Sequence, residues 1–240
     1  MGLVKALLAD VYLTYAGYPV RAGDQFYAES ASHSRELIEE GGYTLFQEYS
    51  DLRNPASPAR LFDAAEERLG PVDVLVNNAS GWVQDTFGPA RVDGFGRPMQ
   101  RVTAQTFRRQ FAVDAMAPAL LIAEFARRLR ARGGGWGRIV GLTSGGQHGF
   151  PDEVSYGAAK AAQENYTMSA SVELADLGVT ANIVYPPVTD TGWVNDEVRA
   201  GVAASRELTH VAAPEEVAEV IAWVASEEAH LLNGSVLRLR

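Results

Sequence analysis

Cysteine is absent from this sequence, and histidine is scarce. Without cysteine, the chain has no disulfide, no thiol nucleophile and no thiolate ligand for a metal. The histidines are scattered and do not show the spacing of metal ligands; they are His33, His148, His210 and His230. A chain without cysteine suits a reducing compartment, so we expect a cytoplasmic protein without a metal centre.

Long apolar runs and an excess of basic residues are missing as well. No stretch reaches the roughly 20 apolar residues that span a bilayer, and the N-terminus does not have the layout of a signal peptide. Asp and Glu number 30 against 21 Lys and Arg, which gives a formal net charge of -9. That sign is opposite to the charge of a nucleic-acid-binding surface. We therefore expect neither a membrane nor a nucleic acid among the partners.

The composition is that of a globular protein. Hydrophobic residues make up 47% of the 240 positions, which is enough for a sizeable core. Neither internal repeats nor low-complexity linkers divide the chain. We predict that residues 1–240 form a single domain, and one sheet with helices on both faces is ordinary at this size.

The most informative stretch is Ser155-Tyr156-Gly157-Ala158-Ala159-Lys160. Residues four apart lie on one face of a helix, so the side chains of Tyr156 and Lys160 point the same way. An ammonium one helical turn away favours the phenolate and lowers the pKa of a tyrosine. Such a phenol can pass a proton to or from a hydroxyl or carbonyl oxygen. The pair alone is also common on solvated helix faces.

Upstream of this pair, residues 138–144 have the pattern of a buried strand that ends at Ser144 and runs into two glycines. The order Ser144, Tyr156, Lys160, with a strand before and a helix after, resembles the short-chain dehydrogenase/reductase family. The resemblance implies an α/β fold with a doubly wound, mostly parallel sheet flanked by helices. It also implies that Ser144 binds the substrate oxygen, Tyr156 is the general acid-base, and Lys160 tunes Tyr156 and holds a ribose. The competing interpretation of Ser144 is a hydroxyl that only caps a strand end.

Further matches to this family precede the pair. Residues 72–76 form an apolar strand pattern followed by Asn77-Asn78-Ala79-Ser80, which resembles the family's N-N-A-G. In the family these residues support the cofactor cleft, so Asn77 and Ala79 are candidate cofactor-binding residues; the asparagine amides can equally bond backbone across the sheet. Asp51, followed by Leu52, resembles the family's Asp-aliphatic pair beside the adenine ring.

Between the two motifs we expect a long loop over residues 81–103 and a helix over residues 106–130. The loop is rich in Gly and Pro, so it either covers a substrate pocket or is a surface insertion. In the family this helix carries an Asn whose backbone holds a water that links the catalytic Lys to solvent. The aligned residue here is Asp114, which is electrostatically compatible with a nearby Lys160.

After the pair, the pattern predicts a helix over residues 156–177 that ends at Gly178, and a strand over 179–185. The resemblance implies that the backbone of Pro187 and Val188 meets the nicotinamide and that Thr191 donates a hydroxyl contact. Residues 189–191 are equally suited to cap a helix. We also expect a substrate lid over residues 193–213, a helix over 214–226 and a closing strand over 233–238.

One expected motif is missing. The family's glycine-rich turn, T-G-x-x-x-G-x-G, brings backbone close to the cofactor pyrophosphate. In the aligned segment, Ala6, Asp10 and Tyr12 stand where glycines belong. We expect strands near residues 25–28 and 43–49 and a helix near 34–40 to follow.

Two hypotheses for the function remain. The first is an NAD- or NADP-dependent oxidoreductase that acts on a small carbonyl or alcohol substrate, as a homotetramer or homodimer formed through the helices over residues 106–130 and 156–177. The second is a protein of the same fold that has lost normal nicotinamide binding, such as a pseudoenzyme, a binding protein or a cofactor-independent enzyme. The retained Lys160 favours the first, and the missing glycines favour the second.

Overall fold

The computed structural model describes residues 51–240 except 90, 95 and 147. The predicted glycine-rich turn and the elements expected over residues 25–28, 34–40 and 43–49 lie outside the described residues.

A parallel sheet forms the centre of the described fold. Its strands lie in the order β1-β4-β5-β6, and each pairs in parallel with its neighbours. In the register, Ile139 of β4 pairs with Leu75 of β1 and with Ala181 of β5. The bounds are β1 Val74–Asn77, β4 Gly137–Leu142, β5 Val179–Tyr185 and β6 Val236–Arg238. β4 is buried throughout, which explains why its sequence is a continuous run rather than an alternation.

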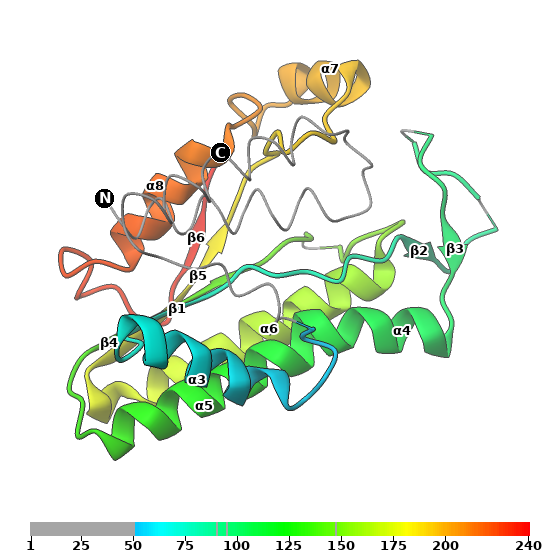
Figure 1. Cartoon of the computed structure of the whole chain (residues 1–240). Helices are drawn as coiled ribbons and strands as arrows, with labels where there is room; N and C mark the ends of the chain where they lie inside the picture. The colour runs from blue at the N-terminus through cyan, green and yellow to red at the C-terminus, as the bar shows by residue number, and fades with distance from the viewer. Residues whose placement is uncertain (1–50, 90, 95, 147) are drawn as a thin grey trace.

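Helices cover both faces of this sheet (Figure 1). Neighbouring residues of a strand point to opposite faces, so Ile139 packs in the core with Phe62 and Phe125, whereas Val140 packs in the core with Ile221. The first core is covered by α3, α5 and α6, and the second by α8. Their bounds are α3 Ser57–Leu69, α5 Ala117–Ala131, α6 Val154–Glu173 and α8 Pro214–Val224. The doubly wound, mostly parallel α/β fold is confirmed.

The helix predicted over residues 106–130 has three parts. It begins as α4 Ala104–Phe111, continues through the π-helical turn η2 Ala112–Met116, and ends as α5. Thr103 caps α4 with its hydroxyl, which accepts from the backbone N–H of Thr106 at 3.1 Å.

The end of α6 is close to the prediction. The α-helix ends at Glu173, and a 3₁₀ turn over Ala175–Leu177 leads into Gly178. Gly178 has φ 67° and terminates the turn in the left-handed region. A Cβ at this position would lie 2.0 Å from the carbonyl oxygen of Gly135, so only glycine fits.

Two expectations need correction. Residues 81–103 are not only a loop, because β2 Asp85–Thr86 and β3 Gln100–Arg101 pair in parallel as a second, small sheet. Residues 189–191 do not cap a helix. The next helix, α7 Asp196–Ala204, is capped by Asn195, whose side chain accepts from the N–H of Val198 at 3.0 Å.

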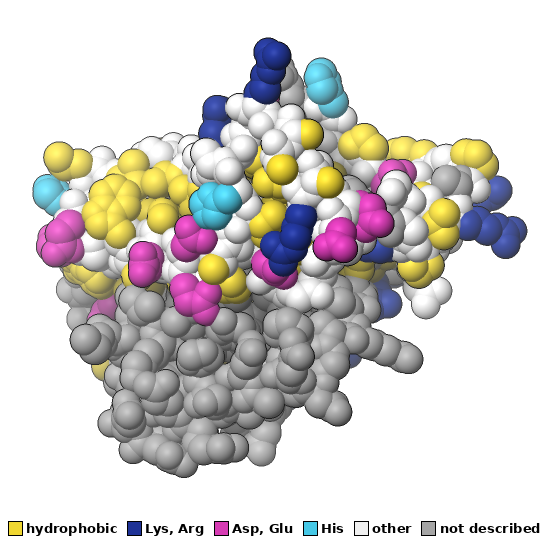
Figure 2. Space-filling view, turned by 90° about the horizontal axis from the view of Figure 1, so that it is seen from above, with side chains coloured by type: hydrophobic (Ala, Val, Ile, Leu, Met, Phe, Trp, Pro, Cys, Tyr) yellow, Lys and Arg dark blue, Asp and Glu magenta, His cyan; other side chains and the backbone are white. Residues whose placement is uncertain are grey.

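Three observations on the described residues concern surface charge, membrane spans and metal binding. On the face seen in Figure 2, acidic side chains lie interspersed with basic and apolar ones. In the described part of the chain, no helix is both long and apolar enough to cross a membrane. Among the same residues, no group of three His, Asp or Glu side chains is placed to hold a metal ion.

Candidate active site

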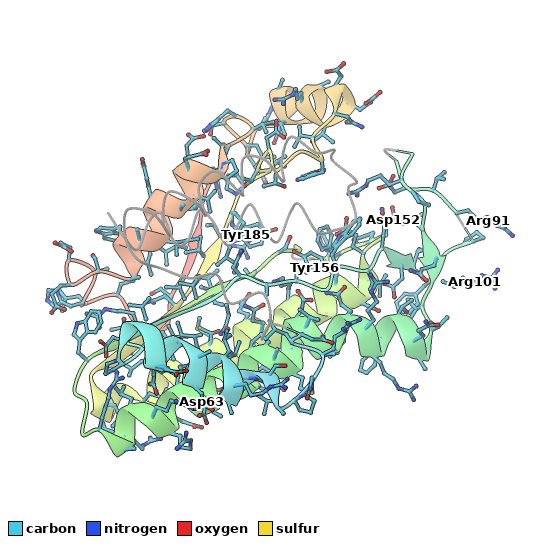
Figure 3. All side chains as sticks on the ribbon, in the orientation of Figure 1. Asp63, Arg91, Arg101, Asp152, Tyr156 and Tyr185 are labelled. Carbon is cyan, nitrogen blue, oxygen red and sulfur yellow. The ribbon has the colours of Figure 1, made fainter. Side chains whose placement is uncertain are left out.

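Three of the predicted site residues lie at one edge of the sheet. Asn77 ends β1, Ser144 follows the end of β4, and Pro187 follows the end of β5. Because these strands are parallel, their carboxyl ends meet at the same edge, where ligands bind in open α/β sheets. Tyr156 lies in the first turn of α6 (Figure 3). Ser144 and Tyr156 are both half-buried.

Lys160 is buried beside Tyr156. Its Nζ lies 5.7 Å from the centroid of the Tyr156 ring. The same Nζ lies 3.2 Å from Oδ1 of Asp114 and donates to Oε1 of Gln163 at 3.1 Å. The structure thus brings Tyr156, Lys160 and Asp114 together, as expected from the spacing of the first two and from the alignment of the third.

Asp114 is fully buried and tightly held. Its Oδ2 accepts from the backbone N–H of Gly81 at 2.7 Å and from Nε2 of Gln110 at 2.6 Å. It lies in the π-helical turn η2, and such turns often occur at functional sites. A buried carboxylate with a cation and two donors around it is compensated, whereas an isolated one would be very costly.

Gln163 is a candidate site residue that the sequence analysis missed. Its side chain is fully buried, accepts from Lys160 and donates through Nε2 to the backbone oxygen of Asn77 at 2.7 Å. It therefore links the end of β1 to the lysine on α6. The available signal was its position one helical turn after Lys160, on the same face.

Two predicted cofactor-binding residues carry buried polar atoms without partners in the described part of the chain. They are Asn77, at both Oδ1 and Nδ2, and Thr191, at Oγ1. The Asn77 amide therefore does not bond described backbone across the sheet, contrary to one of the two interpretations of the motif. A buried polar group without a hydrogen-bond partner lowers the stability of the fold by about 1–3 kcal/mol, and a bound ligand can supply the missing partner. Both residues thus fit a polar ligand at this edge.

The remaining predicted cofactor residues are placed differently. Ala79, Pro187 and Val188 are half-buried near the strand ends, and the oxygen of Val188 accepts from the N–H of Ala212 at 2.9 Å. Asp51 does not join this group. It is exposed, and both its carboxylate oxygens accept from the guanidinium of Arg53, at 2.8 and 3.0 Å.

Residues 81–103 hold the start of α6. The carboxylate of Asp85 accepts from the N–H of Ser155 at 2.8 Å and from its hydroxyl at 2.6 Å, and both residues are buried. Asp85 therefore caps α6 from a distant part of the sequence. The sequence analysis missed this contact, since nothing local distinguishes Asp85 from a solvated acid.

Glu153, immediately before α6, is also buried. Burial raises the pKa of this carboxyl group, while hydrogen bonds from Trp82 and Arg97 act in the opposite direction. Oε2 of Glu153 accepts from the Trp82 indole at 2.8 Å, and Oε1 accepts from Arg97 at 3.0 Å. The segment before Tyr156 is thus fixed by two separate side-chain contacts with residues 81–103.

Comparison with known proteins gives a consistent result. A family model described as enoyl-(acyl carrier protein) reductase matches residues 13–239. The cis-4-hydroxycyclohexanecarboxylate dehydrogenase of Sinomonas cyclohexanicum is 34% identical over 229 residues, which cover 94% of this chain and 86% of the relative. The 3-oxoacyl-acyl-carrier-protein reductase MabA of Mycobacterium tuberculosis is 30% identical over 197 residues, 80% of this chain and 74% of the relative.

A similar solved structure is the angucycline C-6 ketoreductase LanV with bound NADP. It is 28% identical, has a TM-score of 0.69, and the similarity covers 89% of this chain and 80% of that chain. The family-model match begins at residue 13. The segment with Ala6, Asp10 and Tyr12 therefore lies outside it.

Proposed function

The chain belongs to the short-chain dehydrogenase/reductase family, and we propose that this oxidoreductase interconverts a carbonyl and an alcohol with NAD or NADP as cofactor. The observation that carries the proposal is the buried ammonium of Lys160 beside Tyr156, in a network in which each buried charge has a partner. The similar ketoreductase with bound NADP supports a nicotinamide cofactor.

In this proposal the protein's own residues handle the proton. Tyr156 gives its phenolic proton to the carbonyl oxygen during reduction, or takes one from the alcohol during oxidation. Lys160 stabilises the phenolate by charge attraction. Ser144 donates a hydrogen bond to the substrate oxygen and so orients it toward the phenol. The nicotinamide, when bound, supplies or accepts the hydride.

The same proposal assigns the cofactor contacts. Lys160 and Tyr156 hold the nicotinamide ribose, and Thr191 with the backbone of Pro187 and Val188 contacts the carboxamide end. Asn77 and Ala79 line the cleft at the end of β1. The orphaned side-chain atoms of Asn77 and Thr191 support this assignment. Asp51 would contact the adenine, for which its carboxylate would have to exchange one of its bonds to Arg53.

Asp114 takes the position of the family's relay asparagine. We propose that it positions Lys160 through their 3.2 Å ion pair. The protein is further proposed to be a cytoplasmic homotetramer or homodimer of single-domain subunits that acts on a small carbonyl or alcohol.

A second candidate is a protein of this fold without normal nicotinamide binding. The residues that replace the glycines, Ala6, Asp10 and Tyr12, favour it. Titration of the purified protein with NADH and with NADPH, followed by calorimetry, separates the two. Saturable binding of either coenzyme supports the oxidoreductase, and no binding at millimolar coenzyme supports the alternative.

Tyr156→Phe tests the catalytic assignment directly. Only the phenolic proton is removed, so we expect carbonyl reduction to fall by about 10²–10⁴-fold with the fold intact. Tyr166→Phe is the matched control, because Tyr166 lies on the same helix and is 43% exposed. Wild-type turnover by the Tyr156→Phe variant would show that the assignment of the acid-base is wrong.

A further inference from the structure

Arg97 contacts two parts of the chain that flank the candidate site. Its guanidinium carbon lies 5.5 Å from the centroid of the Trp82 ring and 5.6 Å from that of the Trp193 ring. Its Nη2 donates to Glu153 at 3.0 Å. Glu153 directly precedes α6, which carries Tyr156, and Trp193 lies in the segment after β5. Arg97 is thus a point of contact between the catalytic helix and the predicted substrate lid.

A turn built around Asp93 fixes the position of Arg97. The N–H of Asp93 donates to the oxygen of Arg97 at 3.0 Å, and Gly96 adopts a φ of 77° between them. In return, the carboxylate of Asp93 accepts from the backbone N–H of Arg97 at 2.8 Å and from its Nε at 2.6 Å. Gln84 donates to the same carboxylate at 2.7 Å. The contacts between Asp93 and Arg97 therefore orient the guanidinium independently of its contacts with the two indole rings.

Trp193 connects this cluster to the cofactor side of the site. Its indole N–H donates to the backbone oxygen of Thr189 at 3.0 Å. The backbone of Thr189 forms a parallel bridge with Ala212, which closes the segment that contains α7. Thr191, with its unpaired buried hydroxyl, lies between Thr189 and Trp193 in the sequence. A displacement of Trp193 would therefore move the chain next to Thr191.

We propose that Arg97 is a positioning residue that holds the segment after β5 against the catalytic helix and so closes the substrate side of the site. Only the catalytic consequence of this role rests on the proposed function. The planar cation between two indoles supplies the attraction to Trp193, and the charge-assisted bond to Glu153 anchors it to α6. Lys160 is held separately, by Asp114 and Gln163, and Asp85 still binds Ser155 at the start of α6. Loss of Arg97 therefore weakens substrate retention more than proton transfer.

Limited trypsin digestion tests the positioning role without any turnover. Arg206 is exposed just beyond α7, in the segment that Arg97 is proposed to restrain. We expect Arg97→Gln to accelerate cleavage after Arg206 by about fivefold, since a partly exposed cation–π contact changes an equilibrium constant several-fold. Trp193→Ala should have the same effect, and Trp193→Phe, which keeps a ring, a smaller one.

Arg101→Gln is the matched control. Arg101 lies in the same part of the chain and is exposed (Figure 3). This variant should digest after Arg206 at the wild-type rate. Equal rates for Arg97→Gln and Arg101→Gln would overturn the proposal. So would a uniform increase that includes cleavage after Arg128, because this would report general unfolding. Additive effects of Arg97→Gln and Trp193→Ala in the double variant would overturn it as well.

Kinetics provide the second readout. With cyclohexanone, or another simple ketone that the wild-type protein reduces, Arg97→Gln should raise KM about fivefold and leave kcat within about twofold. Arg97→Lys, which keeps the charge but not the planar fork, should recover part of the loss. A fall in kcat at unchanged KM would contradict the proposed role. If no ketone is reduced by the wild-type protein, the proposed function fails while the digestion result still decides the role of Arg97.

Discussion

At the scale of single residues, the site is a set of buried charges that compensate one another. Lys160 has side-chain exposure of only 3%, and Asp114 has none. Neither could be buried alone, because an unpaired charge in the interior costs several kcal/mol. Gln163 and Gln110 complete the set by binding the lysine and the carboxylate respectively. The lysine is therefore held in one place, at a fixed distance from Tyr156.

This arrangement predicts a large effect of removing Asp114. Asp114→Ala leaves the ammonium of Lys160 buried without its counterion, so we expect the free energy of unfolding to fall by about 3–5 kcal/mol. Asp114→Asn keeps the shape of the side chain and one acceptor oxygen, so it should lower the free energy of unfolding by less. Urea denaturation measures both values. The exposed Asp176→Ala serves as control and should stay within about 0.5 kcal/mol of wild type; an equally small change for Asp114→Ala would contradict the ion-pair argument.

The candidate site was predictable from the sequence only in part. Tyr156 and Lys160 are four residues apart on one helix, so a local pattern shows that they share a face. The contact of Asp85 with Ser155 joins residues 70 positions apart, and no local pattern encodes it. The same is true of Glu153, whose partners Trp82 and Arg97 come from another segment. Acidic residues at a distance are indistinguishable from solvated ones until the fold brings them together.

At the scale of elements, apolar periodicity placed the helices and strands well. The strand expected over residues 179–185 is β5, with the same bounds in the structure. The π-helical turn η2 was not predictable, because one added residue in a helix leaves no mark in an apolar pattern. The two-residue strands β2 and β3 were missed for a similar reason, since so short a strand has no alternation to detect.

The contact between α3 and α5 depends on a small ionic network. Arg128 of α5 donates to Asp63 and Glu66 of α3, both at 2.5 Å, and to Glu124 on its own helix at 2.7 Å. Its guanidinium also lies 5.5 Å from the ring centroid of Phe62. Glu124 thus helps to orient the arginine that joins the two helices.

This network predicts a pH-dependent contribution from Glu124. Hydrogen bonds from Arg127 above all, and from Arg128, lower the pKa of this carboxyl group from 4.5 to about 2. Because the pKa of Glu124 is lower in the folded protein than in the unfolded chain, its ionised carboxylate stabilises the fold at pH values above the unfolded-state pKa. This stabilisation is lost as the pH falls toward 2. We expect the free energy of unfolding of the wild-type protein to exceed that of the Glu124→Gln variant by about 1 kcal/mol at pH 7, and by clearly less at pH 3.5.

Urea denaturation at the two pH values measures this difference. The exposed Glu173→Gln, at the end of α6, is the control and should change stability by less than about 0.5 kcal/mol at either pH. A wild-type advantage over Glu124→Gln that is the same at pH 7 and pH 3.5 would show that the ionised carboxylate is not the source of the stability.

At the scale of the whole molecule, exposed aromatic side chains mark a candidate subunit interface. Phe107 of α4 is 48% exposed and stacks on Phe111 with ring centroids 4.2 Å apart. Tyr166 of α6 is 43% exposed. Both residues lie on the helices through which the sequence analysis predicts pairing of subunits. Large exposed aromatic residues are enriched in interfaces between proteins.

We expect the protein to be a homotetramer or homodimer, and Phe107→Glu to reduce the size of the assembly. A carboxylate at the centre of an apolar interface would be buried without a partner. Light scattering at micromolar concentration measures the mass. Phe87→Glu is the control, because Phe87 is 81% exposed but lies in residues 81–103, outside the proposed interface. A monomeric wild-type protein would contradict the prediction of a homo-oligomer.

The glycine-poor start of the sequence bears on the function of the whole molecule. In the family, pyrophosphate rests on backbone N–H groups at the start of a helix, where the helix dipole adds to the attraction. The aligned segment carries Asp10, whose carboxylate would repel the phosphates, and Tyr12, which would fill their space. Residues 6, 10 and 12 lie outside the described residues, so this prediction comes from the sequence alone.

We therefore predict that this chain binds NADH and NADPH more weakly than a variant with glycine at positions 6, 10 and 12. Two unit charges about 4 Å apart repel by about 4 kcal/mol at an effective dielectric of 20, and half of that is more than tenfold in affinity. Asn77, Lys160 and Thr191 would still hold the other end of the coenzyme, so binding should be weakened rather than abolished. Calorimetric titration of both proteins measures the ratio. Micromolar binding by the unmodified chain, unimproved by the three glycines, would mean that the pyrophosphate is bound by another segment.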